Sequence, residues 1–295
     1  MNILETHTVE PLESPVRLSD YVGGKFTRIP SRKGMKKAIK KGLVQINGAP
    51  ADTSRFLHGG EQLTLLADET VQQKPIFELS LPVLLEDDHL ALVNKPAGLL
   101  VSGNAFRTVE NALPFNLQVS SAVDALPRPL PVHRLDFPTT GVLLVAKTRS
   151  ALTALKQQFE ARTVRKVYLA ITTGEMTRQG RIDEPIDDKP AVSKYEVLQS
   201  VPSPRFEQLN LVRLHPITGR RHQLRKHLAH LGHPILGDAD YGLEGQILKG
   251  KGLFLHAYQL TFEHPETGKK MTIKAELGKK YNRHFFKEEG KVKKE

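Results

Sequence analysis

PVHRLDFPTTGVLLVAKT, residues 131–148, holds the sharpest pattern in this chain of 295 residues. The alternation in VHRLD predicts an extended strand with Arg134 and Asp136 on the same face. FPTTG predicts a turn, and the apolar run VLLVAKT predicts a buried strand that returns. An acid beside such a turn is positioned by the backbone yet accessible, as functional residues often are. On this pattern alone, a turn acid or a structural salt bridge with Arg134 is an equally good interpretation of Asp136.

A second segment, LHPITGRRHQLRKHLAHLGHPILGDADYG at residues 214–242, predicts a strand, a turn and a helix over about 221–231. The buried stripe of this helix consists of leucines at i, i+4 and i+7, namely Leu224, Leu228 and Leu231. Arg225 neighbours the stripe, so it is the cation expected to be half buried. A buried guanidinium needs a carboxylate, and Asp136 is the natural candidate.

The histidines of this segment and Tyr168 have ordinary structural interpretations. The histidines of the 214–242 segment show no HExxH pattern and have no carboxylate among them, which argues against a metal site. Packed or RNA-facing histidines explain them better. In RTVRKVYLAITTGE, residues 162–175, Tyr168 lies inside an alternating strand, where a tyrosine is usually a core residue with its hydroxyl at the surface. The run LALVN predicts a strand that ends on a turn with Lys95 at its tip.

The first part of the chain predicts a small helix–helix–hairpin unit over residues 15–66. Ser31 is suited to cap a helix that Gly42 ends, and Asn47-Gly48 is a strong hairpin signal. Eight cations without an acid among them surround this helix: Lys25, Arg28, Arg32, Lys33, Lys36, Lys37, Lys40 and Lys41. Their repulsion would be relieved by a phosphate backbone, so RNA binding is favoured over a solvated basic face.

The remaining boundaries follow from composition. Residues 67–80 lose apolar periodicity and are predicted to be a linker, and residues 81–278 form a strand-rich body. Residues 279–295 are charged and are predicted to be a frayed basic tail. The four prolines of PFNLQVSSAVDALPRPLP, residues 114–131, predict a loop. Strands do not alternate regularly with helices, so an α+β fold is favoured over a doubly wound sheet.

Composition excludes several classes of function. Lys plus Arg number 43 against 32 acids, a formal charge of +11, which favours a polyanionic partner such as nucleic acid. The chain has no cysteine, which excludes disulfides, thiolate nucleophiles and cysteine-ligated metals. An apolar run of about 18 residues and a signal peptide are absent, so no membrane association is expected and a cytoplasmic location is the default.

The motifs together resemble the RluA-type family of pseudouridine synthases. The matching pieces are NKPAGLLV, HRLDFPTTG, RKVYLAI, HPITGRRHQLRKHLAHLGHPILGD and LFLHAYQLTFEHP, which occur in the family's order over about residues 80–275. RLSD, the Ser31-Arg32 helix opening, GLVQING and GGEQL likewise resemble an alpha-L RNA-binding domain. Departures are Thr140 and Arg221 where small hydroxyl residues are usual, Lys226 in place of an apolar residue, and the unusual loop 114–129.

The resemblance implies an α+β catalytic domain with a mixed, largely antiparallel sheet and a central RNA cleft. It also implies isomerisation of uridine to pseudouridine in ribosomal or transfer RNA, with no cofactor and no metal. Asp136 would be the catalytic carboxylate, Arg225 its neutralising partner, and Tyr168 the residue that stacks on uracil. Leu255 would lie at the floor of the site, and Arg134 would fill the space that the extruded base leaves. The expected phosphate contacts are Lys95, Arg220, Arg221, Arg32, Lys33, Lys36 and Lys37.

Two other functions stay open at this stage. A non-catalytic RNA-binding or ribosome-assembly protein could keep the same scaffold, but it has no need of Asp136, Tyr168 and Arg225 together. A hydrolase acting on a glycosidic bond normally uses two carboxylates, and the motifs supply one. The chain is expected to act as a monomer.

Overall fold

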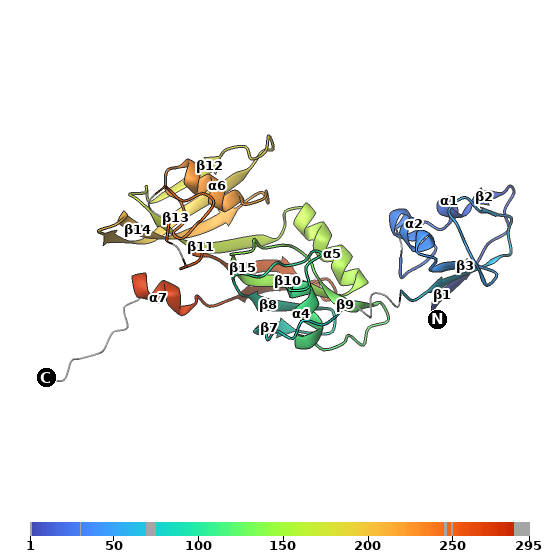
Figure 1. Cartoon of the computed structure of the whole chain (residues 1–295). Coiled ribbons are helices and arrows are strands. Elements are labelled where there is room, and N and C mark those ends of the chain that lie inside the picture. Colours follow the sequence, from blue (N-terminus) through green and yellow to red (C-terminus); the bar gives the residue numbers. More distant parts are fainter. Residues whose placement is uncertain (1, 30, 69–74, 245–246, 249, 286–295) are drawn as a thin grey trace. The chain divides into compact units, whose positions relative to one another are not determined.

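The computed structural model describes residues 2–29, 31–68, 75–244, 247–248 and 250–285, and the chain divides into two compact units, Met1–Lys74 and Pro75–Glu295 (Figure 1). The predicted linker 67–80 falls partly on residues 69–74, which lie outside the described residues. Its last part is not a free linker, because the Phe77 amide donates to the Asn111 carbonyl at 2.9 Å and Leu81 is buried. Phe77 and Leu79 also pack against the core of the second unit.

In the residues that the structure describes, the first unit contains a four-stranded antiparallel sheet and two helices. Its sheet order is β1-β6-β3-β4, and β2 pairs separately with β5. The elements are β1 (Ile3–Thr8), β2 (Val16–Arg17), α1 (Leu18–Tyr21), α2 (Arg32–Lys40), β3 (Val44–Ile46), β4 (Ala49–Pro50), β5 (Phe56–Leu57) and β6 (Gln62–Leu66). The unit therefore reaches beyond 15–66, because β1 completes its sheet.

Local signals explain how the first unit folds. The Ser31 hydroxyl accepts a hydrogen bond from the Gly34 amide at 3.1 Å and caps α2. Asn47 and Gly48 both have positive φ, 48° and 81°, as a two-residue hairpin between β3 and β4 requires. Met35 and Ile39 of α2 are buried, whereas the lysines of the opposite helix face are exposed.

The second unit is built on a ten-stranded mixed sheet. Its main order is β12-β13-β14-β11-β15-β10-β8-β7, with β16 paired to β15 and β9 paired to β10. Among the described strands β10 and β15 run parallel, and the other pairings are antiparallel. The predicted α+β class is therefore confirmed. The elements are β7 (Val83–Glu86), β8 (Leu90–Lys95), α4 (Val109–Asn116), β9 (Ala125–Pro131), β10 (Thr140–Thr148), α5 (Arg149–Glu160), β11 (Arg165–Thr173), β12 (Gln179–Asp183), β13 (Val192–Ser203), β14 (Glu207–Pro216), α6 (Gln223–His230), β15 (Leu255–Glu263), β16 (Lys270–Lys274) and α7 (Lys279–Phe285).

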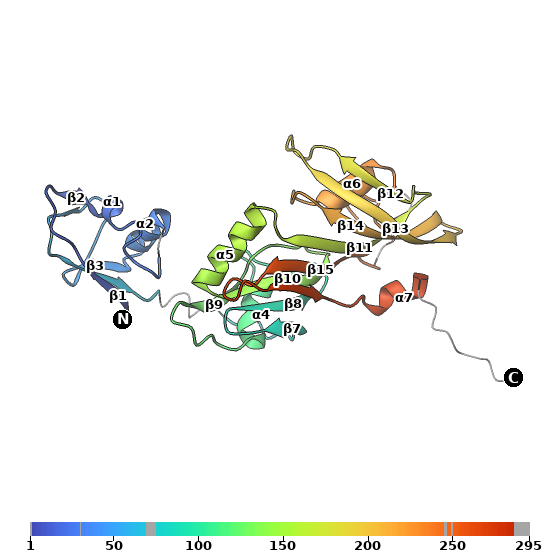
Figure 2. The ribbon, with the colours of Figure 1, turned by 180° about the vertical axis from the view of Figure 1, so that it is seen from behind.

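Strand β10 is buried on both faces, as its apolar run predicts. Leu143 packs in one cluster with Leu113 of α4, and Leu144 packs in another with Leu155 of α5. Figures 1 and 2 show the two helices on opposite sides of this part of the sheet. At the start of β10, Gly141 has φ +116°, and a Cβ there would lie 2.2 Å from the Ala257 carbonyl oxygen of β15. Only glycine permits this approach, which brings the 132–139 segment next to β15.

Three local predictions are wrong. Residues 125–131 form strand β9 rather than a loop, because prolines are tolerated on a strand that is paired on one side. HRLD is not a strand, because β9 ends at Pro131 and the chain continues in irregular structure to Thr139. Residues 279–285 form α7 rather than a frayed tail, because Tyr281 and Phe285 bury their rings in the core. Residues 286–295 lie outside the described residues.

Candidate active site

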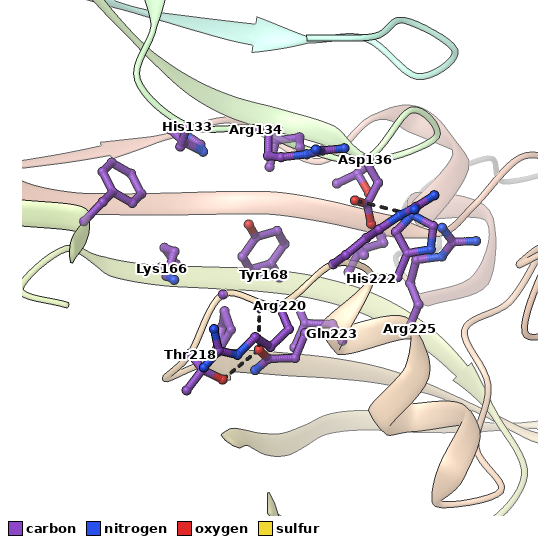
Figure 3. Close-up of a pocket in the computed structure, with 18 residues that line it drawn as sticks. His133, Arg134, Asp136, Lys166, Tyr168, Thr218, Arg220, His222, Gln223 and Arg225 are labelled. Atoms are coloured by element: carbon purple, nitrogen blue, oxygen red, sulfur yellow. Dashed lines mark hydrogen bonds and ion pairs between the residues drawn. The ribbon is translucent and has the colours of Figure 1, made fainter. Parts of the chain in front are cut away.

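A cavity of about 430 Å³ opens between the 133–139 segment, strand β11 and the start of α6 (Figure 3). Its wall contains Arg134 and Asp136 from the first element and Tyr168 from the second, three residues that the family resemblance assigns to one site. Leu255, the first residue of β15, is buried and also lines it. The wall further includes the cations Lys166, Arg220, Arg221 and Arg225. Among the described residues that line this cavity, Asp136 is the single carboxylate.

The Asp136 side chain is 19% exposed and projects into the cavity. A turn holds its backbone, since the Thr139 amide donates to the Asp136 carbonyl at 3.0 Å. The hydroxyl of Thr139 is buried in the same wall and has no hydrogen-bond partner among the described residues. This hydroxyl is a buried polar group without such a partner, which carries a cost in stability at the turn that bears Asp136.

Lys95 was expected to contact phosphate. This prediction is wrong, because the side chain is fully buried. Its Nζ donates to the carbonyls of Pro96 at 2.9 Å, Phe137 at 3.2 Å and Thr139 at 2.8 Å. Burial lowers the pKa of Lys95 to about 8, and the nearby Asp136 carboxylate partly opposes this shift. Lys95 therefore holds the turn that carries Asp136 through hydrogen bonds to its backbone carbonyls.

Arg225 lines the cavity but is not paired with Asp136. Its Nε and Nη2 donate to both oxygens of Asp238 at 2.7 and 2.6 Å, and Nη2 also reaches Asp240 at 2.7 Å. Burial lowers the pKa of Arg225, but the bonds to these two acids outweigh it and raise the pKa overall. A carboxylate partner was correctly expected, but it comes from the loop after α6 rather than from the 133–139 segment.

The basic side chain nearest to Asp136 is His222, which no sequence pattern singled out. His222 Nε2 lies 3.9 Å from Asp136 Oδ1, and its Nδ1 lies 3.0 Å from the Tyr241 hydroxyl. His222 precedes α6 with φ 55°, a left-handed conformation that is uncommon for histidine. Burial lowers the pKa of His222, although Asp136 opposes the shift, so the ring is neutral at pH 7. The positive φ is not visible in the sequence.

Tyr168 lies across the cavity from His222 on β11 (Figure 3). Burial, and to a smaller extent the Asp136 carboxylate, raises the pKa of its hydroxyl, so the phenol stays protonated at neutral pH. The same face of the cavity carries Lys166, whose pKa burial lowers. Tyr168 can thus stack and donate a hydrogen bond, but it does not supply a phenolate.

The loop before α6 is fixed by a small hydrogen-bond network. The Gln223 side-chain oxygen accepts from the Thr218 hydroxyl at 2.7 Å and from the Arg220 amide at 2.9 Å (Figure 3). The Arg220 side chain is held by the Pro190 carbonyl at 3.1 Å, whereas Arg134 and Arg221 are exposed at the rim. Leu224 and Leu228 of α6 are buried, but Leu231 is 36% exposed because the helix ends at His230.

The basic cluster of the first unit is less unbalanced than the sequence suggests. Arg32 pairs with Asp20, Lys25 with Glu10, and Lys41 with Asp68. These acids lie outside the 25–41 segment, and chain folding brings them to it. Lys33, Lys36 and Lys37 are exposed on α2, and no ion pair is found for them among the described residues.

In the part of the chain that the structure describes, no three or more His, Asp or Glu side chains are grouped as metal ligands would be. No described helix has the length and apolar character needed to cross a membrane.

Comparisons with known proteins agree on one family. A family model described as RNA pseudouridylate synthase matches residues 89–230. The chain is 36% identical over 301 residues to ribosomal large subunit pseudouridine synthase D of Vibrio cholerae, covering 92% of this chain and 90% of that protein. It is 34% identical to an uncharacterized RNA pseudouridine synthase of Aquifex aeolicus, covering 83% and 85%. Among solved structures, human RNA pseudouridylate synthase domain containing 4 is similar, with a TM-score of 0.54, 27% identity, and coverage of 68% of this chain and 90% of that chain.

Proposed function

This chain belongs to the RNA pseudouridylate synthase family, and on that premise we propose that it isomerises uridine in large-subunit ribosomal RNA with Asp136 as the catalytic carboxylate. The RNA class rests on the names of the relatives, several of which are called ribosomal large subunit pseudouridine synthase D. The observation that carries the residue assignment is the cavity, in which Asp136 is the single carboxylate among the described lining residues. The protein acts in the cytoplasm as a monomer and uses no cofactor.

The reaction moves no atoms in or out of the RNA. The bond from the sugar C1′ to uracil N1 breaks, the ring turns, and C1′ joins C5, from which a proton leaves while N1 gains one. Asp136 serves either by attacking C1′ or by removing a sugar proton so that uracil is released. A cavity of about 430 Å³ is within the usual size of small-ligand sites, which suits a detached base that must rotate.

The other cavity residues take roles that fit their protonation. Tyr168 keeps its proton, so it stacks on the ring and donates a hydrogen bond. Neutral His222, 3.9 Å from Asp136, is suited to accept a proton in the closing step. Arg225 is engaged with Asp238 and Asp240, so it fixes the loop after α6 rather than neutralising Asp136.

Binding requires the uridine to leave its stack, which costs a few kcal/mol. Arg134 is exposed at the cavity rim beside Asp136, a position from which it can fill the vacated space. Phosphate contacts from Arg220 and Arg221 offset part of this cost. The exposed lysines of α2, with Arg32, add sequence-independent RNA affinity in the role of an alpha-L domain.

The test is conversion of a large-subunit ribosomal RNA transcript by the purified chain, with pseudouridines mapped by chemical labelling and reverse transcription. The wild type should modify defined uridines, and Asp136→Asn should form none while keeping its RNA affinity. Asp183→Asn, which alters an exposed surface pair with Arg181, is the matched control and should remain active. Release of free uracil would indicate a hydrolase. Tight binding without conversion by the wild type would favour the non-catalytic alternative.

A further inference from the structure

A second cavity, of about 420 Å³, lies directly beside the first. The two share one wall, which contains Arg134, Asp136, Arg221, His222 and Arg225. Asp136 therefore stands between two chambers of nearly equal size. A single uracil ring at Asp136 requires the first chamber only, and the reaction proposed above leaves the second without a role.

One side of the second chamber is apolar, and its large side chains are exposed to solvent rather than packed in the core. Phe137 is 53% exposed and Leu100 is 39% exposed, and both line it together with Pro138. The Phe137 backbone is firmly held, since its carbonyl accepts from the Gly98 amide at 2.9 Å and from Lys95 Nζ at 3.2 Å. A fixed backbone with an aromatic ring left in solvent is the form of a stacking platform.

The charges around the second chamber favour a polyanion. Arg134 and Arg221 are exposed in the wall that both chambers share. Asp240 also lines the second chamber, but its carboxylate is held 2.7 Å from the Arg225 guanidinium. Apart from Asp136, the exposed charge in the shared wall is therefore the positive charge of Arg134 and Arg221, at the boundary between the two chambers.

We propose that the second chamber binds the nucleotide next to the target uridine, with its base stacked on Phe137 and the linking phosphate held by Arg221. The inference rests on the proposed function, because it takes the uridine to occupy the chamber at Asp136. It makes Phe137 a determinant of which uridines are modified. A stack of this kind tolerates any base, so the chamber requires that the neighbouring base be present and unstacked from the RNA.

The test uses a stem–loop RNA that carries a uridine mapped as a target, together with two versions that lack the base on its 5′ or its 3′ side. Loss of one base–aromatic stack corresponds to roughly a five- to 150-fold effect. Phe137→Ala should lower kcat/KM on the intact RNA by about that factor, and Phe137→Tyr should restore it. With the wild type, one of the two abasic RNAs should have a kcat/KM that is lower than that of the intact RNA by a similar factor. With Phe137→Ala, the same abasic RNA should be converted almost as well as the intact RNA, because the stack is already lost.

The matched control is Phe115→Ala, which removes a ring of similar exposure, 52%, from α4 and should leave kcat/KM unchanged. If Phe137→Ala and the wild type lose the same factor on both abasic RNAs, Phe137 does not hold the neighbouring base and the inference is wrong. Failure of the proposed function looks different, because the wild type then forms no pseudouridine on any RNA. In that case the fluorescence anisotropy of labelled RNAs with Asp136→Asn and with Asp136→Asn/Phe137→Ala still decides whether Phe137 stacks on a base.

Discussion

Replacing Lys95 with methionine tests whether the buried amine positions the turn that carries Asp136. The change keeps most of the apolar volume and removes three hydrogen bonds to backbone carbonyls. The Phe137 carbonyl keeps the Gly98 amide as a donor, so the carbonyls of Pro96 and Thr139 bear the loss. A buried acceptor left without a donor costs about 1–3 kcal/mol, and relief from burying a cation offsets part of the sum.

We therefore expect Lys95→Met to lower the free energy of unfolding by about 2 kcal/mol, which shifts Tm by roughly 4–8 °C in a unit of this size. The turn should also loosen around Asp136, and a displacement of about 1 Å at a reacting group can lower the rate about 100-fold. We expect kcat to fall by about that factor while RNA affinity stays near the wild-type value. Thermal unfolding and single-turnover conversion of RNA measure the two effects.

The control is Lys147→Met, which removes another buried lysine that bonds Glu86 at 2.7 Å and the Asp87 carbonyl at 2.6 Å. It should lower Tm but leave kcat unchanged at temperatures well below unfolding. If Lys95→Met has wild-type kcat, or if both variants lose the same activity, Lys95 has no positioning role.

The pKa of Lys95 adds a dependence on pH with a definite sign. Its folded-state pKa, about 8, lies below the ordinary value of 10.5, so between these values the unfolded chain binds more protons. Stability from this group therefore rises with pH from about 8 to 10.5, by at most about 3.4 kcal/mol at 1.36 kcal/mol per unit. The stability of the wild type relative to Lys95→Met, measured by urea unfolding, should increase across this window and be constant below it.

Two further perturbations address other parts of the molecule. Asp238→Asn removes the carboxylate that makes two hydrogen bonds with the buried Arg225 guanidinium. The free energy of unfolding, measured in urea, should fall by about 3–5 kcal/mol. A decrease of less than about 1 kcal/mol would contradict the importance of this pair. Replacing Lys36 and Lys37 together with glutamine should reduce the slope of log Kd against log salt by roughly 1–2 for RNA, and an unchanged slope would show that α2 does not contact phosphate.

Local sequence patterns predicted the elements that depend on local physics. The apolar run of β10, the Ser31 cap and the Asn47-Gly48 hairpin all follow from short-range rules. The grouping of Asp136 and Tyr168 in one cavity came from family resemblance, since the two lie on separate elements and nothing local connects them.

The failures arose where tertiary contacts decide the outcome. The need of Arg225 for a carboxylate was predictable, but the choice of partner was not, because it depends on how the loop after α6 folds back. Asp238 lies only 13 residues after Arg225 in the same sequence segment, and this proximity could have indicated it as the partner. His222 was missed because its role comes from a left-handed backbone, and α7 was missed because the lysines around Tyr281 mask its buried ring.

The prolines of β9 have a consequence for how the protein behaves in concentrated solution. The Val132 amide, just beyond β9, points to β10 and donates to the Leu144 carbonyl at 2.9 Å, so by alternation the position of Pro131 faces away from β10. Proline has no amide hydrogen, and an incoming strand finds no donor at this position. Copies of the molecule are thus discouraged from pairing with β9, and a substitution that restores the donor would weaken this protection against aggregation.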